Sequence, residues 1–125
     1  MTVRGIRGAI SISNNSVDDI INGTKELLSE MLLKNKLEHA DIISIFFSTT
    51  SDLNATFPAK AARELDLIDT PLLCLNEIDV PNSLQKIIRI LMHVNSTKKQ
   101  SDIQHIYLKD AVKLRPDLAK NNYNL

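Results

Sequence analysis

The chain has 125 residues, of which 43% are hydrophobic, and its 15 basic and 15 acidic side chains give a formal net charge of zero. This length predicts one domain with a substantial core, and the charge balance argues against nucleic-acid binding, which usually needs a basic excess. A single cysteine, the absence of a signal-peptide pattern and the absence of any membrane-length apolar run favour a cytoplasmic protein without membrane contact.

Residues 3–12 alternate imperfectly and predict a strand. The alternation places Arg7 on one face, and Gly5 and Gly8 allow another backbone or a ligand to come close. Two interpretations of Arg7 follow from these residues. It is either a surface arginine on an edge strand, which is the commoner case, or it points into a cavity.

Residues 16–36 predict the longest helix. Ser16 and Asp19 have the spacing of a capping box, and apolar residues then recur at helical spacing, which indicates a packing face. Residues 42–48 predict a buried strand. Pro58 suits the first turn of a short helix on which Phe57, Lys60 and Arg63 share one side. By residue type alone, Phe57 would be core and the two cations a solvated face.

Residues 72–79 and 84–94 place charged groups within very apolar sequence. A guanidinium among isoleucines, as at Arg89, needs a partner. That partner is either Glu77 or Asp79 in a structural ion pair, or an anionic ligand. The apolar periodicity of residues 84–94 favours a helix, whereas the β-branched residues and the two apolar faces also fit a buried strand.

Residues 103–108 predict a strand, and residues 110–117 a short helical turn that Pro116 ends. The three histidines lack the spacing of metal ligands, so we expect no metal site. A phosphate-binding loop and a nucleophile motif are also missing from the sequence.

Six blocks of the sequence, in order, resemble the monofunctional, trimeric chorismate mutases of the pseudo-α/β-barrel class. Each block is weak alone, but together they cover residues 2 to about 118. The blocks are RGIRGA at 4–9, FPAKAARE at 57–64, Cys74 with Glu77 and Asp79, Ile88 with Arg89, HIYL at 105–108, and LRPDL at 114–118.

The resemblance implies an α+β fold in which a mixed β-sheet is backed by one long and one short helix, and three copies form a pseudo-α/β barrel. Residues 1–118 would be the single domain, and residues 119–125 a flexible tail. The active sites would lie between subunits of the homotrimer. In this fold residues around Arg89 form a strand, against the helical periodicity.

The resemblance also implies roles for single residues. Arg89 would contact the ether oxygen of chorismate, and Glu77 would accept a hydrogen bond from the ring hydroxyl. Arg7 and Tyr107 would hold the side-chain carboxylate, and Cys74 and Leu73 would belong to the pocket wall. Phe57, Lys60 and Arg63 would form a wall contributed across the subunit interface. Leu114 and Arg115 would belong to a C-terminal segment that closes over the site.

The implied reaction is the unimolecular [3,3] rearrangement of chorismate to prephenate in phenylalanine and tyrosine biosynthesis. It needs no cofactor, which fits the absence of nucleophile and cofactor motifs. Two alternatives stay open from the residues: a trimeric enamine/imine deaminase of similar fold, which also binds a carboxylate through arginine, and a non-catalytic trimer that binds a small anion.

Overall fold

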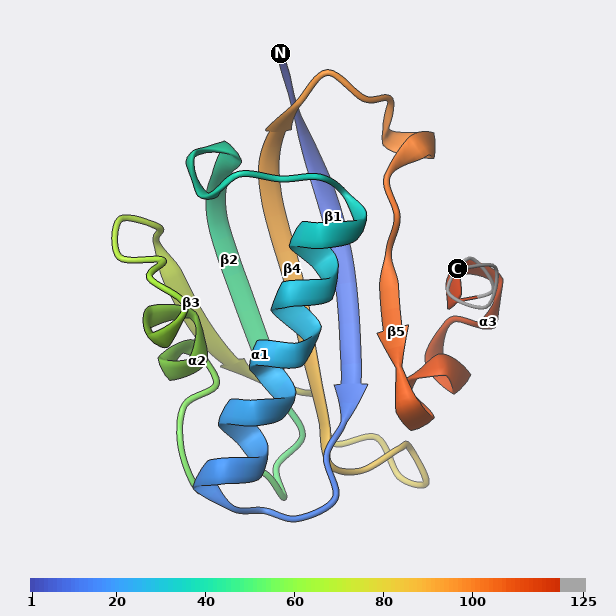
Figure 1. The fold of residues 1–125 in the computed structure, drawn as a ribbon. Helices are drawn as coiled ribbons and strands as arrows, with labels where there is room; N and C mark the ends of the chain where they lie inside the picture. The colour runs from blue at the N-terminus through green and yellow to red at the C-terminus, as the bar shows by residue number, and fades with distance from the viewer. Residues whose placement is uncertain (120–125) are drawn as a thin grey trace.

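The computed structural model describes residues 1–119, which form a five-stranded mixed sheet with its two longer helices on one face (Figure 1). This arrangement confirms the expected α+β fold, with one long and one short helix behind a mixed sheet. The elements in chain order are β1 (Thr2–Ser11), α1 (Val17–Lys34), η1 (His39–Asp41), β2 (Ile42–Thr49), α2 (Ala59–Glu64), β3 (Leu72–Asn76), β4 (Ile87–Ser96), η2 (Gln100–Asp102), β5 (Ile106–Leu108), η3 (Lys109–Leu114) and α3 (Pro116–Ala119).

The strand order β3-β2-β4-β1-β5 places β4 at the centre of the sheet. Strand β4 pairs antiparallel with β1 and β2, whereas the two edge strands, β3 and β5, pair in parallel. Arg89 lies opposite Ala9 on one side and Ser48 on the other, and Ala9 lies opposite Tyr107. Residues directly opposite each other project to the same face, so this row carries its side chains together.

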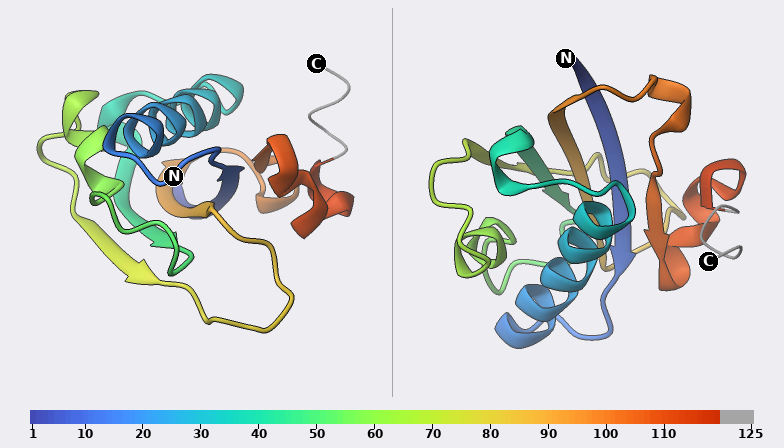
Figure 2. Two further views of the ribbon diagram at one scale, coloured as in Figure 1. Left: turned by 90° about the horizontal axis from the view of Figure 1, so that it is seen from below. Right: turned by 45° about the horizontal axis from the view of Figure 1, so that its top comes forward.

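Helix α1 begins where the sequence predicted. The Ser16 hydroxyl accepts a hydrogen bond from the Asp19 backbone N–H at 3.1 Å, which satisfies one of the unpaired groups of the first turn. The predicted capping box is only half formed, because the Asp19 carboxylate accepts from the Asn14 side chain. Figure 2 shows α1 and α2 on the same side of the sheet.

The main core lies between these helices and the sheet. The buried face of α1 packs on alternate residues of β1, β2 and β4. The largest side chains of this core with almost no exposure include Ile6, Ile10, Leu27, Leu28, Met31, Ile45, Phe47, Ile88 and Met92. Burial of this size accounts for most of the stability of such a domain.

On the other face of the sheet, η3 packs over Ala9, Ile87 and Tyr107, and no helix within residues 1–119 covers the part nearer β3. Three of its leucines keep a large part of their surface exposed: Leu73 is 51%, Leu75 is 49% and Leu91 is 41% exposed. These leucines, together with Ser48 and Arg89, make up the uncovered face of the sheet. Within residues 1–119, no helix has the length and apolar character needed to cross a membrane.

Three local predictions differ from the structure. The helix that the periodicity of residues 84–94 favoured is wrong, because residues 87–96 form β4, as the family resemblance implied. The predicted strand at 103–108 is shorter, since only Ile106–Leu108 pair with β1. Pro116 was expected to end a helical turn, but it begins α3, where its fixed φ and missing N–H fit the first turn.

The C-terminus is described as far as Ala119, which is the last residue of α3. Residues 120–125 of the expected flexible tail lie outside the described residues, so the tail stays a prediction.

Candidate active site

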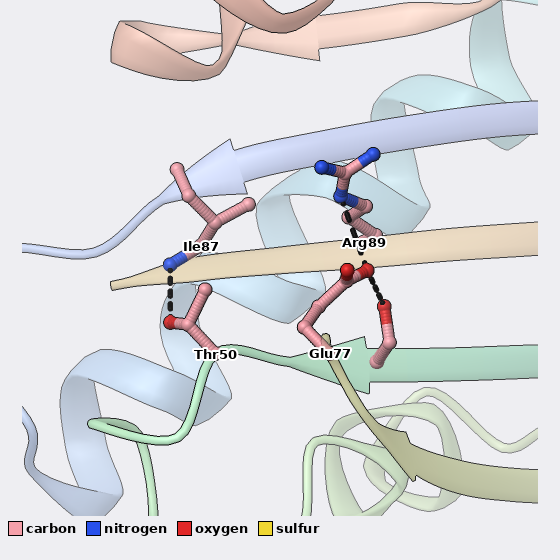
Figure 3. Close-up of polar contacts among 5 residues, drawn as sticks. Thr50, Glu77, Ile87 and Arg89 are labelled. Carbon is pink, nitrogen blue, oxygen red and sulfur yellow. Dashed lines mark hydrogen bonds and ion pairs between the residues drawn. The ribbon is translucent and has the colours of Figure 1, made fainter. Parts of the chain in front are cut away.

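Arg89 and Glu77 form an ion pair on the uncovered face. The Arg89 Nε lies 3.1 Å from the Glu77 Oε1. The same oxygen accepts a hydrogen bond from the Ser48 hydroxyl at 2.7 Å (Figure 3). Glu77 follows β3 directly, and its backbone N–H donates to the Thr49 carbonyl at 2.9 Å. This bond holds Glu77 against the end of β2, beside Arg89.

The ion pair leaves most of the Arg89 guanidinium available. Within residues 1–119, its Nε–H is buried and makes no hydrogen bond of good geometry, so the contact with Glu77 is one of charge and not a two-bond fork. Figure 3 shows the two terminal nitrogens pointing away from Glu77. Side-chain exposure is 43% for Arg89 and 23% for Glu77, so both groups are partly shielded from water.

A cavity of about 220 Å³ adjoins the ion pair. Its lining comes from the ends of β2 and β4, the loop between β3 and β4, and η3: Thr50, Glu77, Ile78, Val80, Ser83, Leu84, Ile87, Arg89 and Leu114. A second cavity, of about 380 Å³, shares Thr50, Glu77 and several residues of the same loop. The structure therefore shows both outcomes that the sequence left open for Arg89: a protein partner and an adjoining hollow.

Hydrogen bonds fix the beginning of β4, two residues before Arg89. Thr50 pairs with Ile87 through its backbone N–H, and its hydroxyl accepts from the Ile87 N–H at 3.0 Å (Figure 3). The Asp52 carboxylate accepts from the Lys86 N–H at 3.0 and 3.2 Å. Lys86 has a φ of 53°, a left-handed conformation that costs free energy and needs such support.

Tyr107 is almost fully buried on β5, where the charges of three guanidinium groups act on it. Burial raises the pKa of the Tyr107 phenol, and the charges of Arg7, Arg115 and Arg89 oppose that rise. Arg115 makes two bonds to Asp117, with Nε to Oδ1 at 3.1 Å and Nη2 to Oδ2 at 2.9 Å. The hydrogen bonds to Asp117 raise the pKa of Arg115. This end of the sheet therefore concentrates positive charge, as a binding site for carboxylates requires.

His105 directly precedes β5 and contacts the backbone of Arg7. Its Nδ1 accepts a hydrogen bond from the Arg7 backbone N–H at 2.9 Å, where the pairing of β1 with β5 stops. The acceptor role requires a neutral ring. Burial, followed by the charges of Arg7 and Arg115, lowers the pKa of His105.

The structure brings together part of the predicted site. Arg89, Glu77 and Leu114 line one cavity. Tyr107 packs with Ile87 and Leu114 of that lining, and the charges of Arg7 and Arg115 act on its phenol. The described part of the chain holds no group of three or more side chains arranged to bind a metal ion.

Of the eleven predicted site residues, only Glu77, Arg89 and Leu114 line this cavity, and four of the others lie at the far edge of the sheet. Phe57 is 69% exposed, Leu73 is exposed on β3, and Lys60 and Arg63 are exposed on or beside α2. In Figure 1, α2 and β3 occupy one edge of the sheet, and η3 and α3 lie beside β5 at the opposite edge.

Cys74 lies on the other side of β3 from Leu73. It is partly buried, pairs in register with Phe47 and packs against the main core. It does not line the cavity beside Glu77, and the expected contact of its thiol with a substrate stays a prediction.

Sequence reasoning overlooked Ser48. Its side chain projects to the same face as Arg89, on a strand whose alternate residues Ile45 and Phe47 are buried. The apolar run of residues 42–48 predicts only a buried strand, and Phe46 between Ser44 and Ser48 leaves no clear polar face in the local pattern. The pairing of β2 with β4, which places Ser48 beside Arg89, could not be read from local sequence.

Comparisons with known proteins give one consistent family. Residues 3–118 match the family described as chorismate mutase type I. The chain is 41% identical over 120 residues to "Chorismate mutase AroH" of Bacillus subtilis (strain 168), covering 95% of this chain and 94% of the relative. It is 42% identical over 117 residues to "Chorismate mutase AroH" of Thermus thermophilus, covering 93% and 96%. Among solved structures, the chorismate mutase from Clostridium thermocellum matches with a TM-score of 0.85 and 54% identity, over 86% of this chain and 96% of that chain.

Proposed function

Because this chain belongs to the family of type I chorismate mutases, we propose that the cavity beside Arg89 and Glu77 binds chorismate and converts it to prephenate. The observation that carries the proposal is that Arg89 lines a cavity, contacts Glu77 only through its Nε side, and has its two terminal nitrogens pointing away from that carboxylate. The reaction belongs to aromatic amino-acid biosynthesis. A cytoplasmic location is part of the proposal, since a lone cysteine suits a reducing compartment.

The rearrangement is unimolecular, so the protein must hold the substrate with its reacting carbons close together and stabilise the charge that develops. One C–O bond breaks as one C–C bond forms, and no proton or electron leaves the substrate. Negative charge grows on the ether oxygen in the transition state. A fixed guanidinium at this oxygen lowers the barrier, because it needs no reorganisation when the charge appears.

The other charged residues would orient the substrate. We assign the ring hydroxyl to Glu77, and the side-chain carboxylate to Arg7 and Tyr107. Leu114 lines the cavity from η3, and the next residue, Arg115, adds positive charge, which supports a role for this segment in closing the site.

We further propose that the working form is a homotrimer and that a neighbouring copy completes each site. Phe57, Lys60, Arg63 and Leu73 would then supply the outer wall from the opposite edge of the sheet. Two features support this assembly: these residues are exposed in the single chain, and the uncovered face displays apolar side chains that a second copy would bury.

A spectroscopic assay of the purified protein with chorismate tests the proposal. Loss of the chorismate absorbance, with prephenate identified as the product by chromatography, is the expected result. Turnover of an imine substrate alone would favour a deaminase. Binding of chorismate without turnover would favour a non-catalytic protein, and either result would overturn the proposed function.

A further inference from the structure

We propose that Ser48 is a positioning residue that keeps Glu77 from turning into a two-bond ion pair with Arg89. This inference rests on the proposed function. Ser48 lies opposite Arg89 in the pairing of β2 with β4, so its hydroxyl is held beside the ion pair. It donates to the Glu77 Oε1 at 2.7 Å, the same oxygen that lies 3.1 Å from the Arg89 Nε (Figure 3).

A carboxylate and a guanidinium normally prefer a fork of two parallel hydrogen bonds. The contact in this structure is different, because it uses one carboxylate oxygen and only the Nε side of Arg89. The terminal torsion of a glutamate rotates easily. The bond from Ser48 opposes that rotation by fixing Oε1 at the end of β2, where the backbone of Glu77 is also held by Thr49.

The consequence is that two groups stay available to a ligand. Within residues 1–119, the Glu77 Oε2 and the terminal nitrogens of Arg89 make no hydrogen bond. Both side chains line the same cavity. In the proposed reaction, Oε2 would accept from the ring hydroxyl while the guanidinium faces the ether oxygen. Loss of the Ser48 hydroxyl would let Glu77 turn onto Arg89 and weaken both interactions.

The test compares Ser48→Thr with Ser48→Val, which have nearly the same shape and differ in one hydroxyl. We expect the threonine variant to keep most of the wild-type kcat for chorismate. The valine variant, and likewise Ser48→Ala, should lose roughly 10- to 100-fold in kcat, the range expected for a lost hydrogen bond to a charged group. The KM should rise by a smaller factor, because the developing charge exists only in the transition state.

Ser44→Ala is the matched control. Ser44 lies on the same face of β2, four residues earlier, and its hydroxyl is 3.4 Å from the His93 ring. This substitution should leave kcat unchanged. Urea unfolding of every variant checks that the loss of activity is not a loss of folded protein.

A double-mutant cycle shows whether Ser48 acts through Glu77. In a Glu77→Ala background, Ser48→Ala should cause no further loss of kcat, whereas an additive loss would overturn the inference. Equal activity of the threonine and valine variants in a chorismate-converting protein would also overturn it, while leaving the proposed function intact. If the wild-type protein did not convert chorismate at all, the proposed function and this inference would both fail.

Discussion

Arg89 carries the largest expected effect of any single residue. Arg89→Lys replaces a planar fork with a compact ammonium, which does not fit the same positions. We expect kcat for chorismate to fall about 10²- to 10³-fold, the usual effect of losing one transition-state donor, with a smaller change in KM. Steady-state kinetics measures both constants.

Arg4→Lys serves as the control for this substitution. Arg4 lies near the start of β1, the strand beside β4, and its Nε donates to the Lys98 carbonyl at 2.8 Å, away from the cavity. The kcat of the Arg4→Lys protein should match that of the wild type. A kcat for Arg89→Lys within a few-fold of the wild type would contradict the assignment.

The lowered pKa of His105 predicts how the free energy of unfolding depends on pH. The folded protein disfavours protonation of this ring, so the pKa of His105 lies below its ordinary value of 6.5. The unfolded chain binds this proton more readily as the pH falls, and stability therefore declines below about pH 6.5 until the folded-state pKa is passed. Urea unfolding between pH 8 and pH 5 measures this decline.

His105→Asn separates this effect from general acid denaturation. The asparagine amide oxygen can accept from the Arg7 N–H but does not titrate, so the decline near pH 6 should become smaller. His39→Asn, on the exposed η1, retains His105 and should keep the full decline. An unchanged decline in the His105→Asn protein would show that another group is responsible.

The sequence predicted the role of a residue best where its side chain is chemically unusual for its surroundings. A guanidinium between isoleucines required a partner, and Glu77 is that partner. Ser48 and His105 act through bonds that join distant strands, to Glu77 and to the Arg7 backbone. Such bonds depend on strand pairing, so no local pattern could indicate them.

At the level of elements, β4 shows why periodicity can mislead. Ile88, Ile90 and Met92 alternate strictly toward the helices, which is the strand signal. Ile87 and Leu91 are apolar on the opposite face, and the combined pattern imitates a helical stripe. The second apolar face exists because β4 is central and its outer side meets η3 near Ile87. The sequence therefore showed that the segment is buried but not which element it forms.

The contact between α1 and β1 depends on a residue without a side chain. A Cβ on Gly8 would lie 2.5 Å from the Met31 sulfur and 3.1 Å from a Leu27 methyl, and both side chains are fully buried. Gly8→Ala should therefore lower the free energy of unfolding by about 1–3 kcal/mol, as overpacked cores usually do. Urea unfolding at constant pH measures the change.

Gly5→Ala on the same strand is the matched control for Gly8→Ala. A Cβ on Gly5 would meet only a Leu91 methyl, at 3.9 Å, which is an ordinary contact. Its stability should stay within about 0.5 kcal/mol of the wild type. Equal losses from the two substitutions would mean that α1 moves away at little cost.

For the whole molecule, the uncovered face of the sheet predicts concentration-dependent behaviour. If the proposed trimer buries this face, Leu91→Lys should favour the monomer by placing a charge at the interface. Analytical ultracentrifugation should show this shift, and the activity should fall with it because each site would lose its outer wall. Dilution of the wild type should have the same effect.

Leu33→Lys is the control for this experiment. Leu33 is 67% exposed on α1, which lies on the helix side of the sheet, and this variant should assemble as the wild type does. A fully active monomer, from either Leu91→Lys or dilution, would contradict a site shared between copies.

The pairing of β1 also constrains how the chain folds during its synthesis. Strand β1 lies between β4 and β5, and its Arg4 bonds to Lys98, 94 residues later. Ribosomes add roughly 5–20 residues per second, so the first strand emerges several seconds before both of its neighbours exist. Contacts this far apart in sequence also slow folding. The nascent protein must therefore keep the apolar side chains of β1, such as Ile6 and Ile10, from aggregating until translation has almost finished.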